Sequence, residues 1–378
     1  MSSKALPLLP GAMLGILGGG QLGRMFTVAA RTMGYQVMVL DPDPKSPAGQ
    51  MADLHLQAGY TDAAALEQMA ARCAAITTEF ENVPADSLIA LAKSCRVSPG
   101  ADAVAIVQDR SHEKSWLAQH GFPTAPFALV YNEGDLDAAL ADIGTPALLK
   151  VARFGYDGKG QARIQAPADA HAAFREFGGQ PCVLEGFVNL ECEVSVVLAR
   201  NDAGDCALFP VAENRHVNGI LDVSIVPARV TDALAQQARD MARGVADALG
   251  YVGVMAVEFF VADGHLLVNE IAPRPHNSGH YTLDACVTDQ FEQQVRALCG
   301  LPLGDTRLLS PVAMVNILGD RWQDEGPHWQ TLLAHPNVKL HLYGKESARP
   351  GRKMGHFNVL DVHAGAALGL AESLRDAL

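Results

Sequence analysis

Two glutamates interrupt stretches of the sequence that are otherwise almost wholly apolar. Glu258 lies within Val254–Val261, and Glu270 lies within Leu266–Ile271. Burying an ionised carboxylate is costly, and two carboxylates close together also repel each other, so such a pair needs a shared cation or a shared proton. Oxygen ligands suit Mg²⁺. We therefore predict a Mg²⁺ site at Glu258 and Glu270. The alternative is two unrelated buried acids, each paired with an arginine or a lysine.

Whether the two glutamates meet depends on the hairpin that joins their strands. Side chains alternate between the two faces of a strand, so one extra loop residue moves a side chain to the other face. A three-residue loop, Asp263–His265, would place Glu258 opposite Glu270 on one face. A two-residue loop would place them on opposite faces. We expect the three-residue loop.

A lysine followed by a glycine-rich segment predicts a site for nucleotide phosphates. Lys150 stands near the end of the apolar run Ala147–Val151, and three glycines follow within Gly155–Gln161. The lysine ammonium is a compact charge for phosphate oxygens, and glycines let backbone N–H groups approach the phosphates closely. The alternative is a strand that ends in a solvated hairpin.

Two further acids follow at positions suited to an adenosine. Glu185 precedes Gly186, Phe187 and Val188, so one carboxylate and the neighbouring backbone amides could contact the adenine edge and the ribose. Glu193 comes next, on a predicted strand. Both acids could instead face solvent, but their apolar flanks favour burial.

The segment Gly18–Gly23 has the spacing GxGxxG and lies between an apolar strand and an amphipathic helix. Asp41 ends the next strand, where a dinucleotide-binding domain places its ribose-binding acid. Glycines let the backbone close on an anion, and the helix N-terminus offers free N–H groups, so any phosphate would suit. Taken alone, the loop leaves three interpretations open: a dinucleotide, another phosphate ligand, and a tight structural turn.

Four basic residues fall within nine positions near the end of this acidic chain: Lys345, Arg349, Arg352 and Lys353. Glycines punctuate the segment, and they allow the backbone conformations that a ligand-lining loop needs. We expect this segment to reach Gly18–Gly23 and to hold one phosphate together with it. The alternative is a solvated basic loop.

The elements that must position these residues follow two patterns. Over the first hundred residues, strand and helix signals alternate with short Gly/Pro breaks, which predicts an open parallel sheet. Later strands have the pattern of antiparallel pairs, which indicates a change of domain. The predicted fold class is α/β, and the predicted domains are 1–110, 111–182, 183–305 and 306–378.

Composition narrows the classes of partner. The 378 residues carry a formal net charge of −13, which repels nucleic-acid phosphate and anionic membranes alike. The seven cysteines lie in apolar runs without a CxxC pair, as expected for reduced thiols of a cytoplasmic protein. The apolar stretch at the start is too short to span a membrane. We expect a cytoplasmic protein that binds small molecules and neither nucleic acid nor membrane.

Taken in order, the motifs resemble the ATP-grasp superfamily. Within it, Gly18–Met25 (GGGQLGRM), Thr77–Val83 (TTEFENV), Phe154–Gly160 (FGYDGKG) and Ala272–His280 (APRPHNSGH) are similar to the N5-carboxyaminoimidazole ribonucleotide synthetase family. The resemblance covers nearly the whole chain. It implies an ATP-grasp fold with an N-terminal open parallel α/β (pre-ATP-grasp) domain, central ATP-grasp α+β domains and a small C-terminal α+β portion. It also implies a homodimer.

The resemblance further implies roles for individual residues. The ATP contacts match Arg110, Lys150, Gly155, Tyr156, Asp157, Gly158, Lys159, Gly160, Gln161, Glu185, Gly186, Phe187, Val188, Glu193, His216, Asn269 and Glu270. The contacts to 5-aminoimidazole ribonucleotide match Gly20, Gln21, Leu22, Glu81, Lys345, Arg352 and Lys353. The catalytic positions match Arg274, Tyr156, Asp157 and His276, and the magnesium ligands match Glu258 and Glu270. Many superfamily members have an asparagine where this chain has Ala272, which leaves the number of Mg²⁺ ions open.

The implied reaction is the carboxylation of 5-aminoimidazole ribonucleotide by ATP and bicarbonate, through carboxyphosphate, in purine biosynthesis. Arg274 would stabilise the carboxyphosphate, and His276 would either aid proton transfer or serve as a hydrogen-bonded loop histidine. Three alternatives remain at this point. They are a sister ATP-grasp enzyme such as the formate-using glycinamide ribonucleotide transformylase, an NAD-dependent dehydrogenase, and a nucleotide-sensing module without catalysis.

Overall fold

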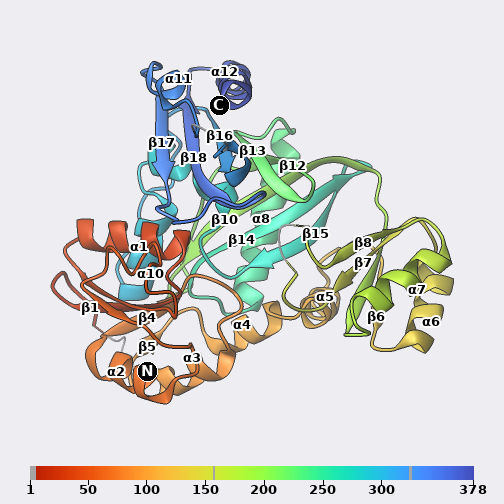
Figure 1. The fold of residues 1–378 in the computed structure, drawn as a ribbon, viewed down its shortest axis with the longest axis horizontal. Coiled ribbons are helices and arrows are strands. Elements are labelled where there is room, and N and C mark those ends of the chain that lie inside the picture. The colour runs from red at the N-terminus through yellow and green to blue at the C-terminus, as the bar shows by residue number, and fades with distance from the viewer. Residues whose placement is uncertain (1–5, 156–157, 323–325) are drawn as a thin grey trace.

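The computed structural model describes residues 6–155, 158–322 and 326–378. In these ranges the strands form three sheets (Figure 1). A parallel sheet holds the N-terminal part, a small antiparallel sheet lies at the right of the view, and a large antiparallel sheet runs from the centre to the C-terminal strands at the top. None of the helices in the described ranges combines the length and the apolar character needed to cross a membrane.

The N-terminal sheet has the order β3-β2-β1-β4-β5, and all its pairs are parallel, as predicted. Its strands are β1 (Met13–Leu17), β2 (Gln36–Leu40), β3 (Leu54–Leu56), β4 (Ala75–Thr78) and β5 (Arg96–Val97). The accompanying helices are α1 (Gln21–Thr32), α2 (Ala63–Arg72), α3 (Ala85–Ala92) and α4 (Ala101–Val107). The central strands are buried on both faces, as the apolar runs in their sequence require.

The small sheet carries the predicted nucleotide lysine. It has the order β6-β9-β7-β8, and its pairs are antiparallel. Its elements are β6 (Phe127–Val130), α6 (Glu133–Ile143), β7 (Ala147–Val151), β8 (Gln161–Ile164), α7 (Pro167–Glu176) and β9 (Cys182–Gly186). Helices α6 and α7 share one apolar cluster with the sheet. Helix α5 (Arg110–Gln119) leads into this part of the chain.

The large sheet has the order β15-β14-β10-β12-β13-β16-β18-β17, with β11 paired to β10. Its strands are β10 (Leu190–Arg200), β11 (Cys206–Leu208), β12 (Ala212–Val217), β13 (Ile220–Val226), β14 (Gly253–Ala262), β15 (His265–Ala272), β16 (Val312–Leu318), β17 (Val338–Leu342) and β18 (Lys353–Leu360). The associated helices are α8 (Asp232–Ala248), η1 (Asn277–Gly279), α9 (Thr282–Ala285), α10 (Gln290–Cys299), η2 (Gly319–Arg321), α11 (Trp329–Leu333) and α12 (Ala364–Ala377). The C-terminal strands thus continue this sheet. The division into domains at 110, 182 and 305 stays a prediction.

The hairpin between β14 and β15 differs from the expected loop. Ala262 pairs with His265, so the loop consists of the two residues Asp263 and Gly264. Their φ angles of 50° and 72° lie in the left-handed region that a tight two-residue hairpin turn uses. The predicted three-residue loop is therefore wrong.

A β-bulge restores the pairing that the loop alone would have prevented. The register shifts by one residue after Phe259 pairs with Val268, and Glu258 then pairs with Glu270. Asn269 is the extra residue on β15. A bulge sets two residues of one strand against one of its partner, which has the same effect on register as a longer loop. The predicted pairing of the two glutamates is thus confirmed.

Helix α10 joins the parallel sheet to the large sheet. Its residue Phe291 is fully buried in an apolar cluster with Leu14 of β1 and Phe26 of α1. The side-chain amide of Gln294 donates to Thr77 Oγ1 at 2.8 Å and accepts from the Val254 amide at 2.5 Å. Helix α10 therefore shares an apolar core with the parallel sheet and forms a buried polar bridge between the two sheets, which fixes one relative to the other.

Because this core is shared, we predict that Phe291→Ala lowers the unfolding free energy by about 3–5 kcal/mol, the usual cost of truncating a buried Phe. Denaturant unfolding followed by circular dichroism should still show a single transition. The control is Leu309→Ala at a side chain that is 58% exposed, which should stay within about 0.5 kcal/mol of the parent. Two separate transitions, only one of them shifted, would contradict the shared core.

Candidate active site

The predicted nucleotide lysine lies against the first predicted adenosine acid. Lys150 Nζ donates to Glu185 Oε2 at 2.7 Å across the small sheet, and Lys114 Nζ of α5 lies 3.7 Å from the other carboxylate oxygen. Burial alone would raise the pKa of Glu185, but the two ammonium groups lower it to about 2. The carboxylate is therefore ionised. Its Oε1 is buried without a hydrogen bond in the described part of the chain, which leaves it ready to accept from a ligand.

Sequence reasoning missed Lys114, which is fully buried. Its ammonium donates to the backbone oxygen of Asn269 at 2.9 Å, so it ties the small sheet to β15. Burial lowers the pKa of Lys114, and the Glu185 carboxylate opposes that effect. Its position in the sequence could have indicated its role. Lys114 stands four residues after Arg110 on one helix, a spacing that puts both side chains on the same face.

Arg110 and Glu270, both predicted ATP contacts, meet at this junction. Arg110 Nη2 lies 3.6 Å from Glu270 Oε2. Glu113, also missed from sequence, accepts from the Ile271 amide at 2.5 Å. Its pKa is raised to about 7, because burial outweighs the nearby Arg110 cation. Helix α5 therefore presents one face of charged side chains to the bulged end of β15.

The glycine-rich segment folds over the turn between β12 and β13. A Cβ on Gly158 would lie 2.8 Å from the Asn218 oxygen, and a Cβ on Gly219 would lie 2.6 Å from the Gly158 Cα. Glycine is needed at both positions because the two backbones touch there. Tyr156 and Asp157, predicted for ATP binding and catalysis, lie outside the described residues. Lys159 is exposed at the edge of this segment.

The end of β9 leads into the predicted adenosine contacts. Gly186 is its last residue, and Phe187 and Val188 follow at the surface end of the strand. The Phe187 ring is half exposed, and the Arg163 guanidinium lies over it at 4.7 Å from the ring centroid. Gln161, the first residue of β8, pairs with Lys150. These residues line the same side of the small sheet's edge as Lys150.

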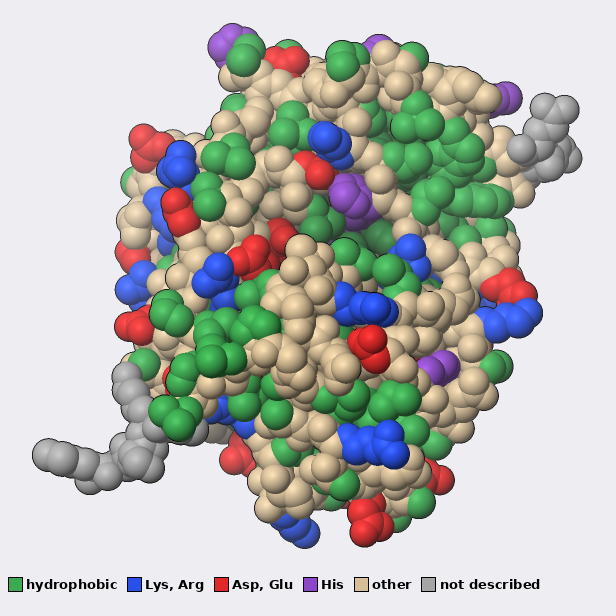
Figure 2. All heavy atoms as spheres, turned by 90° about the vertical axis from the view of Figure 1, so that its left-hand side faces the viewer, with side chains coloured by type: hydrophobic (Ala, Val, Ile, Leu, Met, Phe, Trp, Pro, Cys, Tyr) green, Lys and Arg blue, Asp and Glu red, His purple; other side chains and the backbone are tan. Residues whose placement is uncertain are grey.

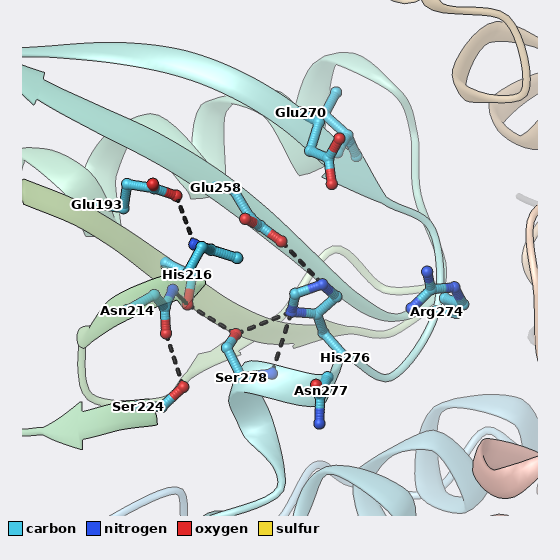
Figure 3. Close-up of polar contacts among 12 residues, drawn as sticks. Glu193, Asn214, His216, Ser224, Glu258, Glu270, Arg274, His276, Asn277 and Ser278 are labelled. Carbon is cyan, nitrogen blue, oxygen red and sulfur yellow. Dashed lines mark hydrogen bonds and ion pairs between the residues drawn. The ribbon is translucent and has the colours of Figure 1, made fainter. Parts of the chain in front are cut away.

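Neighbouring strands of the large sheet bring acids and histidines together (Figure 3). His216 Nδ1 on β12 lies 2.8 Å from Glu193 Oε2 on β10. His276 Nε2 lies 2.8 Å from Glu258 Oε1 on β14. Burial would raise the pKa of Glu258, but the nearby histidines lower it to about 2. The predicted metal ligand Glu258 thus has a histidine partner, whereas Glu270 points to Arg110.

The surroundings of His276 define which of its nitrogens carries the proton. Its Nδ1 accepts from the Ser278 amide at 3.3 Å and lies 2.8 Å from Ser278 Oγ. The proton of a neutral ring is therefore on Nε2 and is donated to Glu258. Ser278 Oγ in turn bonds Ser195 Oγ, which accepts from Asn214 (Figure 3). Contacts at both ring nitrogens therefore fix the orientation of His276.

The glycine turn before α1 is held by two acids that follow β2 and β4, the strands on either side of β1. Asp41 Oδ2 accepts from the Gly19 amide at 2.7 Å and from the Tyr60 hydroxyl at 2.8 Å. Glu79 accepts from the amides of Gly20 and, at 2.6 Å, Gly23. Sequence reasoning did not assign Glu79, although it stands within the motif Thr77–Val83. Because these carboxylates already fill part of the turn, Gly20 does not offer its amide to a ligand.

The amides left at this turn belong to Gln21 and Leu22, for which no acceptor is found in the described part of the chain. The predicted contact with the C-terminal basic segment is present: Lys345 Nζ donates to Gln21 Oε1 at 2.7 Å. Lys345 also donates to the Lys353 backbone oxygen at 2.6 Å. Arg352 instead bonds within its own loop, to Ser347.

Arg274 follows β15 and pairs with an acid of the N-terminal domain. Its guanidinium donates through Nε to Glu81 Oε2 at 2.5 Å and through Nη2 to Oε1 at 3.3 Å. This bidentate pair lowers the pKa of Glu81 to about 2 despite burial, which acts in the opposite direction. Figure 2 shows charged side chains of both signs and a histidine in the middle of this face, between the C-terminal strands above and the N-terminal domain below.

Comparison with known proteins identifies the family. The chain matches the ribonucleotide synthetase preATP-grasp domain over residues 12–108, the ATP-grasp domain over 115–291 and the phosphoribosylaminoimidazole carboxylase C-terminal domain over 312–368. It is 47% identical to the N5-carboxyaminoimidazole ribonucleotide synthase of Bacillus subtilis, over 93% of this chain and 92% of that protein. The chain belongs to the N5-carboxyaminoimidazole ribonucleotide synthase family.

Solved structures of the synthase family agree with this assignment. An ADP complex of an N5-carboxyaminoimidazole ribonucleotide synthetase is similar with a TM-score of 0.92 and 46% identity, over 97% of each chain. The Aspergillus clavatus N5-carboxyaminoimidazole synthase in complex with ADP and 5-aminoimidazole ribonucleotide has a TM-score of 0.90 and 31% identity, over 98% of this chain and 99% of that one. The expected ATP-grasp fold is confirmed.

We predict that Lys114→Met lowers the unfolding free energy by about 3–5 kcal/mol, because it leaves a buried carboxylate with one cation fewer. It should also raise the KM for ATP more than the KM for 5-aminoimidazole ribonucleotide, since Glu185 and Asn269 are predicted ATP contacts. Denaturant unfolding and steady-state kinetics measure the two effects. The control is Lys93→Met at an exposed lysine, which should change neither the unfolding free energy nor the KM values. Unchanged stability in Lys114→Met would contradict the buried network.

Proposed function

We propose that this chain uses ATP and bicarbonate to carboxylate the exocyclic amine of 5-aminoimidazole ribonucleotide in purine biosynthesis. One observation carries the proposal: the Aspergillus relative is solved in complex with ADP and that ribonucleotide, and this chain has a group of residues suited to each of the two ligands. Lys150, Glu185 and the glycine segment form the nucleotide end. The glycine turn with Lys345 forms the other end.

At the nucleotide end, Lys150 and the amides of Gly155–Gln161 would hold the phosphates, and Glu185–Val188 would contact the adenine. Glu185 Oε1 supports this, because it accepts no hydrogen bond in the described residues, although Lys114 lies 3.7 Å away, and a ligand could supply the donor. Glu193 and His216 would face the ribose and phosphates, with Arg110 and Asn269 alongside. The segment that covers this end would also exclude water from the reaction.

A divalent cation would complete the nucleotide end. Glu258 and Glu270 are paired on adjacent strands, and both offer carboxylate oxygens, which fits the oxygen ligands that Mg²⁺ prefers. The buried Asn269 Oδ1 between them lacks a hydrogen bond in the described residues, which adds a further oxygen. Mg²⁺ there would neutralise charge on the transferring phosphoryl group. Ala272 offers no ligand atom.

The reaction would proceed in two stages. First, a bicarbonate oxygen attacks the γ-phosphorus of ATP, and ADP leaves, which gives carboxyphosphate. Carboxyphosphate then releases phosphate to give CO₂, and the amine attacks this carbon and loses a proton. Arg274, fixed by Glu81, would place a cation beside the carboxyphosphate. The phosphate released from carboxyphosphate would take the amine proton, and His276 would hold the Glu258 carboxylate in place through its Nε2. Tyr156 and Asp157 remain proposed members of the catalytic set.

At the other end, the ribonucleotide phosphate would lie at the Gln21 and Leu22 amides. A helix N-terminus favours an anion, and Lys345 adds a full charge at the same place. Arg352 and Lys353 would add further positive charge beside Lys345. Glu81 would lie near the ribonucleotide because it is paired with Arg274. The glycine turn therefore binds a substrate phosphate in this proposal, and Asp41 supports the turn instead of binding a dinucleotide ribose.

The activity can be tested by ADP release. Release should require ATP, Mg²⁺ and bicarbonate, and it should be strongly stimulated by 5-aminoimidazole ribonucleotide. Mass spectrometry of the product should show the added carboxylate. Stimulation by formate and glycinamide ribonucleotide in place of bicarbonate would instead support the transformylase. ATP binding without turnover would favour a sensor, and dinucleotide binding without ATP turnover would favour a dehydrogenase.

The phosphate site gives a sharper prediction. Lys345→Ala should raise the KM for 5-aminoimidazole ribonucleotide about 10- to 150-fold, because a charge-assisted phosphate contact is worth about 1.5–3 kcal/mol. The KM for ATP should change far less. The control is Lys45→Ala, which removes an exposed lysine paired with Glu346 in the neighbouring loop. Equal changes of the two KM values in Lys345→Ala would remove the phosphate assignment.

Assembly and location complete the proposal. All seven cysteines are free, which supports a reducing compartment such as the cytoplasm. Family resemblance supports a homodimer, which sedimentation equilibrium would test. The net charge of −13 supports small-molecule partners and argues against nucleic acid and anionic membranes.

A further inference from the structure

Three side chains on adjacent strands of the large sheet converge on one point. Glu193 lies on β10, His216 on β12 and Glu258 on β14, and one ligand atom from each lies within 4.8 Å of the others. Strand β10 pairs with both neighbours: Glu193 lies opposite Asn214, and Ser195 lies opposite Glu258. Residues opposite each other share a face, and so do residues two apart, which places the set on one face of a rigid sheet.

The donor set differs in chemistry from the proposed Mg²⁺ pair. An imidazole with two carboxylates suits zinc-class first-row ions, whereas Mg²⁺ prefers oxygen ligands alone. Bonds of about 2.0–2.2 Å to one ion would bring the ligand atoms within about 4 Å of one another, so small side-chain rotations would suffice. His216 Nδ1 is buried and makes no hydrogen bond within the described residues, although Glu193 Oε2 is only 2.8 Å away.

An outer shell already orients one of the three donors. His276 donates to Glu258 and is itself held by Ser278 (Figure 3). Ser278 bonds Ser195, which accepts from Asn214. Hydrogen-bonded partners of this kind fix the orientation of ligating carboxylates in metal sites. The Glu258 side chain is also 9% exposed, so its position is set by packing as well as by hydrogen bonds.

We propose that Glu193, His216 and Glu258 bind one zinc-class divalent ion when no nucleotide is bound. The site shares Glu258 with the proposed Mg²⁺ pair, but it uses Glu193 and His216 in place of Glu270. Because Glu193 and His216 are also proposed ATP contacts, the ion and the nucleotide compete. This last step rests on the proposed function, whereas binding of the ion to the free protein does not.

Co²⁺ is a suitable probe, because it replaces Zn²⁺ and gives visible absorption bands when nitrogen and oxygen atoms bind it. Nucleotide-free protein without a polyhistidine tag is titrated with Co²⁺ in a non-chelating buffer. We expect bands that saturate at one ion per chain and that excess Mg²⁺ does not abolish. His216→Ala should weaken Co²⁺ binding by more than the about 10- to 100-fold that loss of an outer-shell partner costs.

A matched control uses another histidine that is paired with one carboxylate. His171 Nε2 lies 3.0 Å from Asp137 Oδ1. His171→Ala should bind Co²⁺ as the parent does. If His216→Ala does not fold, Glu193→Gln keeps the shape of the side chain and carries the test, with the same expected loss of affinity. No bands from the parent protein, or bands of full strength in Glu193→Gln or His216→Ala, would overturn the proposal.

Competition is measured with adenosine, which has no phosphates to chelate the ion. If Glu193 contacts the ribose, adenosine should weaken Co²⁺ binding in the parent protein. Bands that persist at saturating adenosine would overturn the competition and leave the metal site standing. The ADP-release assay with 5-aminoimidazole ribonucleotide, in buffer freed of transition metals, tests the proposed function separately. The two hypotheses can therefore fail independently.

Discussion

The candidate site depends on buried and partly buried carboxylates that must each have a partner. Glu185 has two lysines, Glu81 has Arg274, Glu258 has His276, and Glu79 has the amides of the glycine turn. An unpartnered buried charge is costly, so each pair constrains the elements that carry it. Most of these pairs join different elements. The strands and helices around the candidate site are therefore fixed relative to one another by the site's own ion pairs and hydrogen bonds.

This coupling explains how a site can form between parts of the chain that are far apart in sequence. Lys114 reaches from α5 to both β9 and β15. Arg274 reaches from the end of β15 to the acid that follows β4. Lys345 reaches from the C-terminal strands to the first helix. The shared core at Phe291 gives these polar contacts a rigid base. Together they tie the N-terminal, central and C-terminal parts of the chain to one another.

The glycine turn shows how the same local motif can serve different ligands. Its spacing and the following Asp41 match a dinucleotide site, yet Asp41 accepts from the Gly19 amide and from Tyr60. A carboxylate bound in this way supports the turn. With Glu79 on the next amides, the start of α1 is left for an anion, and Lys345 from the opposite end of the chain brings a cation to Gln21 there. A dinucleotide site and a site for another phosphate ligand are therefore distinguished by the residues that contact the turn, and not by the spacing of its glycines.

The sequence by itself determined the elements and the types of residue in the site. Strands such as Met13–Leu17 and Ala147–Val151 could be predicted because apolar periodicity is local, and the family motifs named most site residues. The way in which the register is set and most of the long-range ion pairs could not be predicted. The bulge at Asn269 produced the Glu258–Glu270 pair with a two-residue loop, because an extra residue in a strand and one in a loop have the same effect on register. Lys114 and Glu79 were missed because their partners lie far away in sequence, and only the tertiary structure brings buried opposite charges and free amides together.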